Sequence, residues 1–301
     1  MTKIFIFAVS LLTASVVYAG EGLQPYILFG DSGQTIEETN KQLSSALTQG
    51  GFEVLGQYAP TDSPDRSVIV VSHPELLKAL SALRASAGFF SVIRIGIIAD
   101  SGQTLISLQN PEYWGNAYLQ DEYKTVAAVI GKISSEIAAT IQTTFPSANL
   151  KQGYGSTQEF TAEDLRGYHY MFGMPYFEDN VLIGEFASHQ AAVAAIEKNL
   201  QTSSTSSKVF SRDLPGKEIR LFGVALKGET GEANFVPIID ISSQKHVSFL
   251  PYELLVMGKE VRMLHGRFRI ALSFPDLTMG TFTKIMSTPG EIEDLLRSLS
   301  K

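Results

Sequence analysis

Residues 27–35 read Ile-Leu-Phe-Gly-Asp-Ser-Gly-Gln-Thr, and the rest of the chain is organised around them. The apolar residues predict a short strand, and the Gly-Asp-Ser-Gly string predicts a tight turn. Thr35 is placed to cap a helix that we expect to run to about Leu47, because a Thr hydroxyl accepts from the first free backbone N–H groups of a helix. The stretch therefore predicts an opening β-α unit.

The residues before this unit predict a secretory signal. Lys3 precedes an apolar run from Ile4 to Val17, and small residues follow at the positions that a signal peptidase inspects. We expect cleavage after Ala19 and a periplasmic or secreted protein. The apolar run is too short for a membrane span, and no later segment approaches the roughly 20 apolar residues that a span needs.

The composition predicts a globular protein that is held together by its core. The chain has 301 residues, 44% of them hydrophobic and none of them cysteine, so disulfides cannot stabilise it. Its length suits one large domain or two ordinary ones. The net charge of -7 argues against nucleic acid as a partner, because nucleic-acid surfaces need clustered Lys and Arg.

The second half of the chain repeats the order of the first. Val181 to Phe186 predicts a strand, and Ala191 to Leu200 predicts a helix, as in the opening unit. A late hairpin at 247–264 matches the hairpin predicted at 91–108. The halves differ in their middle, where we expect an additional strand at Ile219 to Leu226 in place of a helix after His73.

These matches predict an α+β fold of two similar domains, each an antiparallel sheet with helices packed on one face. The boundaries are a signal peptide at 1–19, a first domain at 20–145, a linker at 146–177 and a second domain at 178–301. The linker carries several Pro and Gly residues and is expected to hold one helical turn. Sheets packed side by side would leave a groove between them.

Each half resembles the bacterial domain-of-unknown-function family 302, whose members adopt a TATA-binding-protein-like β-α-β4-α fold. The resemblance lies in the opening unit, in Ser72-His73-Pro74 before a Leu-rich helix, and in Leu250-Pro251-Tyr252 before the late hairpin. It covers residues 26–143 and 178–300. Family members typically have Cys-Asn-Pro where this chain has Ser72-His73-Pro74, so chemistry of that thiol does not carry over. The resemblance implies a fold rather than an activity.

Residues 29–32, Phe-Gly-Asp-Ser, look like the start of the GDSL hydrolases, in which the serine is the nucleophile. Those enzymes need a late Asp-x-x-His to activate it, and neither His246 nor His265 has an Asp three positions earlier. A serine without a base is a weak nucleophile. We therefore predict no catalytic residue, and Ser32 is the position that tests the esterase alternative.

A metal-binding alternative rests on His169, Met171 and Met174, which lie close together in the sequence. Imidazole and thioether donors suit Cu(I), and a His/Met-ligated haem is a further possibility. The competing interpretation is an aromatic and Met cluster that docks on a domain surface. The identity of any cofactor stays open at this stage.

A ligand-binding hypothesis rests on a basic stretch near the end of the late hairpin. Arg267 and Arg269 alternate with apolar residues, as in a half-buried strand, and could bind an anionic ligand or an acidic partner. His73 and Trp114 are further candidates, although a His before Pro is commonly a turn residue and a Trp commonly closes a core. The full set of ligand-binding candidates is Arg262, His265, Arg267, Arg269, His73 and Trp114.

The sequence thus favours an exported, non-catalytic protein that binds a small ligand or a partner protein. It leaves the ligand unidentified and leaves open whether the protein forms a homodimer.

Overall fold

The structure is a computed structural model and describes residues 22–301, so the predicted signal peptide lies outside the described residues. The first half forms a six-stranded antiparallel sheet in the order β2-β3-β4-β5-β1-β6. Its strands are β1 (Tyr26–Asp31), β2 (Glu53–Tyr58), β3 (Arg66–Ser72), β4 (Ile93–Asp100), β5 (Gln103–Gln109) and β6 (Gln152–Tyr154).

The second half forms a five-stranded antiparallel sheet in the order β7-β11-β10-β9-β8. Its strands are β7 (Val181–Glu185), β8 (Ser206–Asp213), β9 (Ile219–Leu226), β10 (Tyr252–Met257) and β11 (Glu260–Met263). Read from the other edge, this order is the order of the first five strands of the first sheet. The fold is therefore α+β with two similar domains, as predicted.

The matching strand order corrects one expectation. β9 occupies the place in the second sheet that β3 occupies in the first, so Ile219–Leu226 is not an additional strand. The element after β9 is a helix, α7 (Glu232–Ile239), just as α2 (Pro74–Leu80) follows β3.

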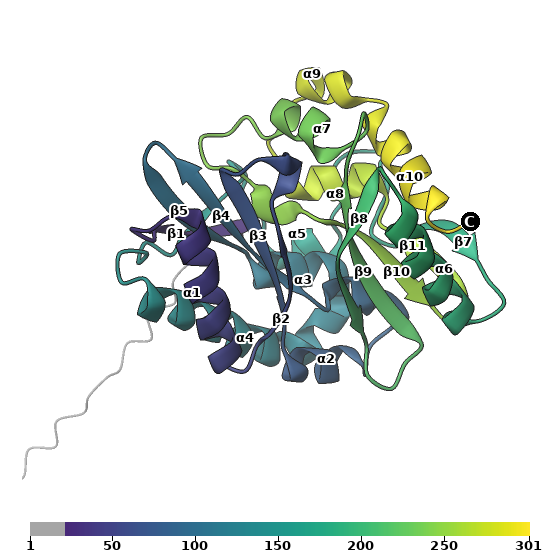
Figure 1. Cartoon of the computed structure of the whole chain (residues 1–301), viewed down its shortest axis with the longest axis horizontal. Coiled ribbons are helices and arrows are strands. Elements are labelled where there is room, and N and C mark those ends of the chain that lie inside the picture. The colour runs from purple at the N-terminus through teal and green to yellow at the C-terminus, as the bar shows by residue number, and fades with distance from the viewer. Residues whose placement is uncertain (1–21) are drawn as a thin grey trace, which may run out of the picture.

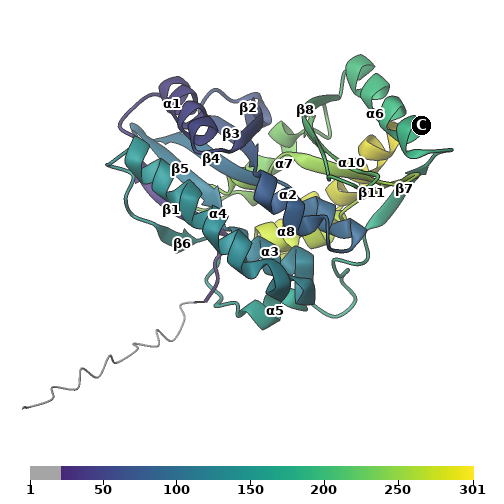
Figure 2. The ribbon, with the colours of Figure 1, turned by 90° about the horizontal axis from the view of Figure 1, so that it is seen from below.

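Helices cover the outer side of each sheet (Figure 1). α1 (Ile36–Gln49) contacts α4 (Tyr123–Thr144), which also contacts α2. In the second half α6 (His189–Thr202) packs on β8, β10 and β11 at the opposite end of the molecule (Figure 2). The remaining helices are α3 (Pro111–Leu119), α5 (Ala162–Arg166), α8 (Gly266–Ser273), α9 (Met279–Phe282) and α10 (Thr288–Ser298).

The opening unit forms as its sequence predicts. The Thr35 side chain accepts from the Glu38 backbone N–H, and the Glu38 carboxylate accepts from the Thr35 N–H, which completes a capping box. Leu43 and Leu47 are fully buried on the sheet-facing side of α1. Gly50 ends the helix.

The space between the two sheets is filled, and the predicted groove between them is not present. β2 approaches β8 so closely that a Cβ built on Gly56 would lie 2.3 Å from the Val209 carbonyl oxygen. Behind this contact, the buried Glu253 on β10 accepts from Arg94 on β4 and from Arg269 on α8. The two domains therefore share one continuous core (Figure 1).

A second buried carboxylate joins the domains at the start of α7. Glu232 accepts hydrogen bonds from the Tyr58 hydroxyl at 3.3 Å, the Thr61 backbone N–H at 3.3 Å and the Leu226 backbone N–H at 3.2 Å. Burial raises the pKa of this carboxyl to about 7, because desolvation disfavours its charged form.

Part of the predicted linker belongs to the first sheet, since residues 152–154 form β6 and pair with β1. The predicted linker ends at residue 177, whereas the chain between β6 and β7 runs from 155 to 180, and we call residues 155–180 the connecting segment. It holds the single short helix α5, as expected, and its buried residues Leu165, Tyr168 and Phe177 tie it to the core. No helix in residues 22–301 is both long and apolar enough to cross a membrane.

Candidate functional site

The connecting segment lies on the surface of α8 and is held there by tyrosine hydroxyls. The Tyr168 hydroxyl donates to the Ala271 carbonyl at 3.0 Å, and the Tyr170 hydroxyl donates to the Leu277 carbonyl at 3.2 Å. Because the hydroxyl at the tip of each tyrosine ring is hydrogen-bonded, these hydrogen bonds fix the positions of both rings. A cleft lies on one side of the segment and a groove on the other.

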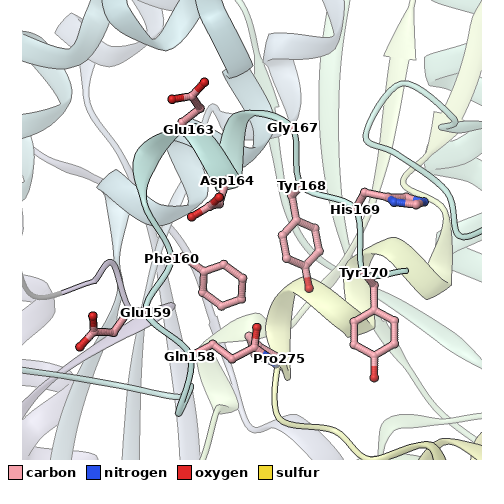
Figure 3. Close-up of a pocket in the computed structure, with 10 residues that line it drawn as sticks. All are labelled: Gln158, Glu159, Phe160, Glu163, Asp164, Gly167, Tyr168, His169, Tyr170 and Pro275. Atoms are coloured by element: carbon pink, nitrogen blue, oxygen red, sulfur yellow. The ribbon is translucent and has the colours of Figure 1, made fainter. Parts of the chain in front are cut away.

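The first of these hollows, which we call the aromatic cleft, is a cavity of about 420 Å³ between the connecting segment and Pro275 (Figure 3). Three aromatic side chains line it, namely Phe160, Tyr168 and Tyr170. The Phe160 and Tyr168 rings are neighbours, with centroids 5.8 Å apart. This volume is in the range that small-molecule sites occupy.

Every charged side chain that lines the aromatic cleft is acidic. Glu159 and Glu163 lie at its rim, and Figure 3 shows the Asp164 carboxylate directed toward the Phe160 ring. Hydrogen bonds from the Thr161 hydroxyl and backbone N–H lower the pKa of Asp164, so this carboxylate is ionised at neutral pH. The His169 ring points away from the cleft (Figure 3).

The hollow on the other side, which we call the Met174 groove, has a volume of about 480 Å³. It is lined by residues from two stretches far apart in the sequence: His169, Phe172, Met174, Tyr176 and Asp179 from the connecting segment, and His265 and Arg267 at the start of α8. The structure thus places candidate residues of the metal hypothesis and of the ligand hypothesis on one surface.

The histidines of the Met174 groove have defined surroundings. The His169 ring stacks on Tyr176 with centroids 4.3 Å apart. His265 caps α8, and its Nδ1 accepts from the Arg267 backbone N–H at 3.2 Å, which leaves Nε2 for other partners. Burial, assisted by the charge of Arg267, lowers the pKa of His265, so its imidazole is neutral at pH 7.

The groove does not bring the three metal candidates together. Met174 lines it, whereas Met171 is 43% exposed outside its lining. The same groove contains one cationic side chain, Arg267, and one carboxylate, Asp179. Within residues 22–301 no group of three His, Cys, Asp or Glu side chains is arranged to hold a metal ion. A copper or haem site at His169, Met171 and Met174 stays a prediction.

The predicted basic face is divided by the fold, because residues 266–273 form α8 and not a strand. Arg269 turns into the core, where it donates to Glu253 at 2.7 Å. Arg262 lies on β11, pairs with Glu260 at 2.8 Å and donates to Asn180. Of the four basic candidates, only His265 and Arg267 line the groove.

The remaining candidates lie in structural positions. The His73 Nδ1 accepts from the Glu75 backbone N–H at 3.2 Å and caps α2. Trp114 is 1% exposed, and its indole N–H donates to the Pro25 carbonyl at 2.8 Å. The Ser32 hydroxyl is buried and lies 2.7 Å from the Thr39 hydroxyl, so its contacts are those of a turn.

The aromatic cleft was not predicted from the sequence. Its signal was the recurrence of aromatic residues, Phe160, Tyr168 and Tyr170 among them, in a segment predicted to be a linker, because aromatic side chains there need a surface to pack on. Only the fold shows that they share a cavity with Asp164.

The comparisons with known proteins bear on the fold. No family model matches the sequence, and a comparison with curated proteins finds no match. Among solved structures, an uncharacterized conserved protein, DUF302, from Bacillus stearothermophilus is similar, with 18% sequence identity and a TM-score of 0.31 over 42% of this chain and 98% of that chain. The matched structure bears the name of the family that the sequence resembles. At this TM-score the repeated fold is established by the strand order, and not by the similarity.

Proposed function

We propose that this protein is an exported, non-catalytic binding protein that holds a small organic cation in the aromatic cleft. The observation that carries the proposal is the composition of the cleft, whose lining combines three aromatic rings with carboxylates and contains no Lys or Arg. Ring faces attract cations through their quadrupole, typically by about 0.5–2 kcal/mol per contact.

The geometry of the cleft supports binding of this kind. The Tyr170 ring is fixed by a hydrogen bond at its hydroxyl, so little side-chain freedom is lost when a ligand stacks on it, and the buried Tyr168 ring packs beside Phe160. The Asp164 carboxylate is ionised and directed into the cleft. A quaternary or primary ammonium group next to Phe160 would then meet a ring face and a negative charge together.

The proposal is tested with choline and with 3,3-dimethylbutan-1-ol, which has the same shape but no charge. We expect isothermal titration calorimetry to show binding of choline, and binding of the neutral analogue at least about tenfold weaker, since charge recognition of about 1.4 kcal/mol corresponds to that factor. Phe160→Leu and Asp164→Asn should each weaken choline binding. Glu178→Gln, a neutralised acid of the same segment outside the cleft, is the matched control.

Equal affinity for the charged and neutral molecules would contradict the proposal. So would choline binding that survives both cleft variants at full strength, provided that their circular dichroism and thermal unfolding match those of the unmodified protein.

A further inference from the structure

The Met174 groove lies in a larger exposed apolar surface. The Phe172 side chain is 100% exposed, and Tyr176 and Met171 on the same segment are 45% and 43% exposed. On the facing side, Met279 of α9 is 47% exposed. Monomeric proteins rarely expose several large apolar side chains together unless the surface binds a partner.

This surface is continuous. A narrow apolar crevice of about 20 Å³ between α8 and α9 is lined by Tyr170, Ile270, Phe274, Leu277 and Met279, and it shares Met174 and Arg267 with the Met174 groove. The surface therefore extends from Phe172, through Met174 and Arg267, to Met279. It borders the aromatic cleft at His169 and Tyr170, and the His169 ring points away from that cleft (Figure 3).

The exposed segment is ordered by its own contacts. The Met174 N–H donates to the Met171 carbonyl at 3.0 Å, which closes a turn with Phe172 at its tip, and Gly173 takes a φ of 80° that favours glycine. The Tyr176 N–H donates to the Asp179 carboxylate at 2.9 Å. The backbone that carries Phe172 is thus held in one conformation, which reduces the entropy lost on binding.

Arg267 determines the charge of the partner. Its side chain is exposed at the centre of the surface, and within residues 22–301 its guanidinium pairs with no carboxylate, unlike Arg262, Arg269 and Arg297. A partner that covers the apolar residues also removes water from this guanidinium. That desolvation is costly unless the partner supplies a carboxylate.

We propose that this surface binds an extended segment of a partner protein that places an apolar side chain in the Met174 groove beside Phe172 and a carboxylate against Arg267. This interaction uses different residues from the proposed cation binding, which rests on Phe160 and Asp164, and the two surfaces border one another at His169 and Tyr170. The two are tested with different variants.

The test selects a random-peptide display library against the full mature protein. We expect selected peptides to be enriched in Asp or Glu next to Phe, Leu or Met. Selection against the Arg267→Glu protein should instead enrich Lys or Arg, because the charge at the centre of the surface is reversed. This substitution is compatible with the fold, since the side chain is exposed and an acid is favoured in the first turn of α8.

Affinities of the selected peptides are then measured by fluorescence anisotropy. Phe172→Ser should weaken the acidic peptides by about tenfold or more, and Phe160→Leu in the aromatic cleft should leave them unchanged. Peptides without acidic enrichment, no selection above the background, or affinities that ignore both Arg267→Glu and Phe172→Ser would overturn the proposal. A protein that is dimeric by light scattering and becomes monomeric as Phe172→Ser would also overturn it, because the occupant would then be a second copy.

Discussion

At the scale of single residues, the carboxylate of Glu253 is buried and depends on two arginine partners for charge compensation. It is 2% exposed and lies between the guanidinium groups of Arg94 and Arg269, which come from different domains. Removing one partner from a buried ionic group leaves uncompensated charge in a medium of low polarity, so the loss exceeds that of an ordinary hydrogen bond.

We therefore expect Glu253→Gln to lower the free energy of unfolding by about 3–5 kcal/mol, measured by urea denaturation. The control is Glu260→Gln, which removes a carboxylate from the half-exposed pair with Arg262 and should cost less than about 1 kcal/mol. If the two variants were equally stable, the buried ion network would not hold the domains together.

This network is the reason that the predicted surface position of Arg269 is wrong. Alternation of Arg and apolar residues at 267–270 fits a strand with one wet face, and nothing in the neighbouring sequence indicates that a carboxylate on β10 meets the second Arg. Arg94, 159 positions before Glu253, completes the group. Long-range ionic partners of this kind are fixed by the fold and have no local sequence signal.

At the scale of elements, the closest approach between the two sheets occurs where β2 passes β8. The Gly56 position has no room for a Cβ, because the nearest atom is a backbone oxygen that cannot rotate away. Gly131 in the middle of α4 is the opposite case, since nothing lies within 4 Å of a Cβ built there and the residue is exposed.

Replacing these two glycines with Ala should therefore change the free energy of unfolding in opposite directions. Gly131→Ala should stabilise the protein by about 0.5–1 kcal/mol, because Ala has the higher helix propensity. Gly56→Ala should destabilise it by roughly 1–3 kcal/mol, because the two edges must separate. Urea unfolding of both variants tests the pair, and a stabilised Gly56→Ala protein would show that the edges are not in close contact.

The elements themselves were largely readable from the sequence. The alternation of apolar residues around the Gly turns predicted both hairpins, and the capping position of Thr35 predicted the start of α1. Residues 266–273 were the main error, because α8 is buried on nearly all sides, Arg269 included, and a helix without an exposed face lacks the 3.6-residue periodicity that distinguishes it from a strand. The aromatic cleft required contacts across the connecting segment, which periodicity does not report.

At the scale of the whole molecule, three buried titratable groups make stability depend on pH. Burial raises the pKa of Glu232 to about 7 and that of Asp240 to about 6, and burial lowers the pKa of His246 to about 4. Asp240 weakens the fold as pH rises through about 4–6, while His246 strengthens it over much the same interval, so these two largely offset one another. Of these three groups, Glu232 therefore determines how the stability of the folded state changes with pH.

Glu232 stabilises the folded state most when it is protonated. Below pH 4.5 the carboxyl is protonated in both states. Between pH 4.5 and 7 the unfolded chain releases the proton first, so stability falls, by at most about 3 kcal/mol. We expect the melting temperature to decrease from pH 5 to pH 8, and Glu232→Gln to reduce that decrease. A wild-type melting temperature that rises over this interval would contradict the assignment.

The contact between β2 and β8 has a consequence for aggregation. Each strand is the outermost of its sheet, and a bare outer strand offers unpaired backbone groups on which other chains can stack. In the joined molecule each of these strands shields the other, and the remaining outer strands, β6 and β7, are only three and five residues long. A single half produced alone would present its longer outer strand uncovered, so the second domain keeps the first one soluble as well as extending its core.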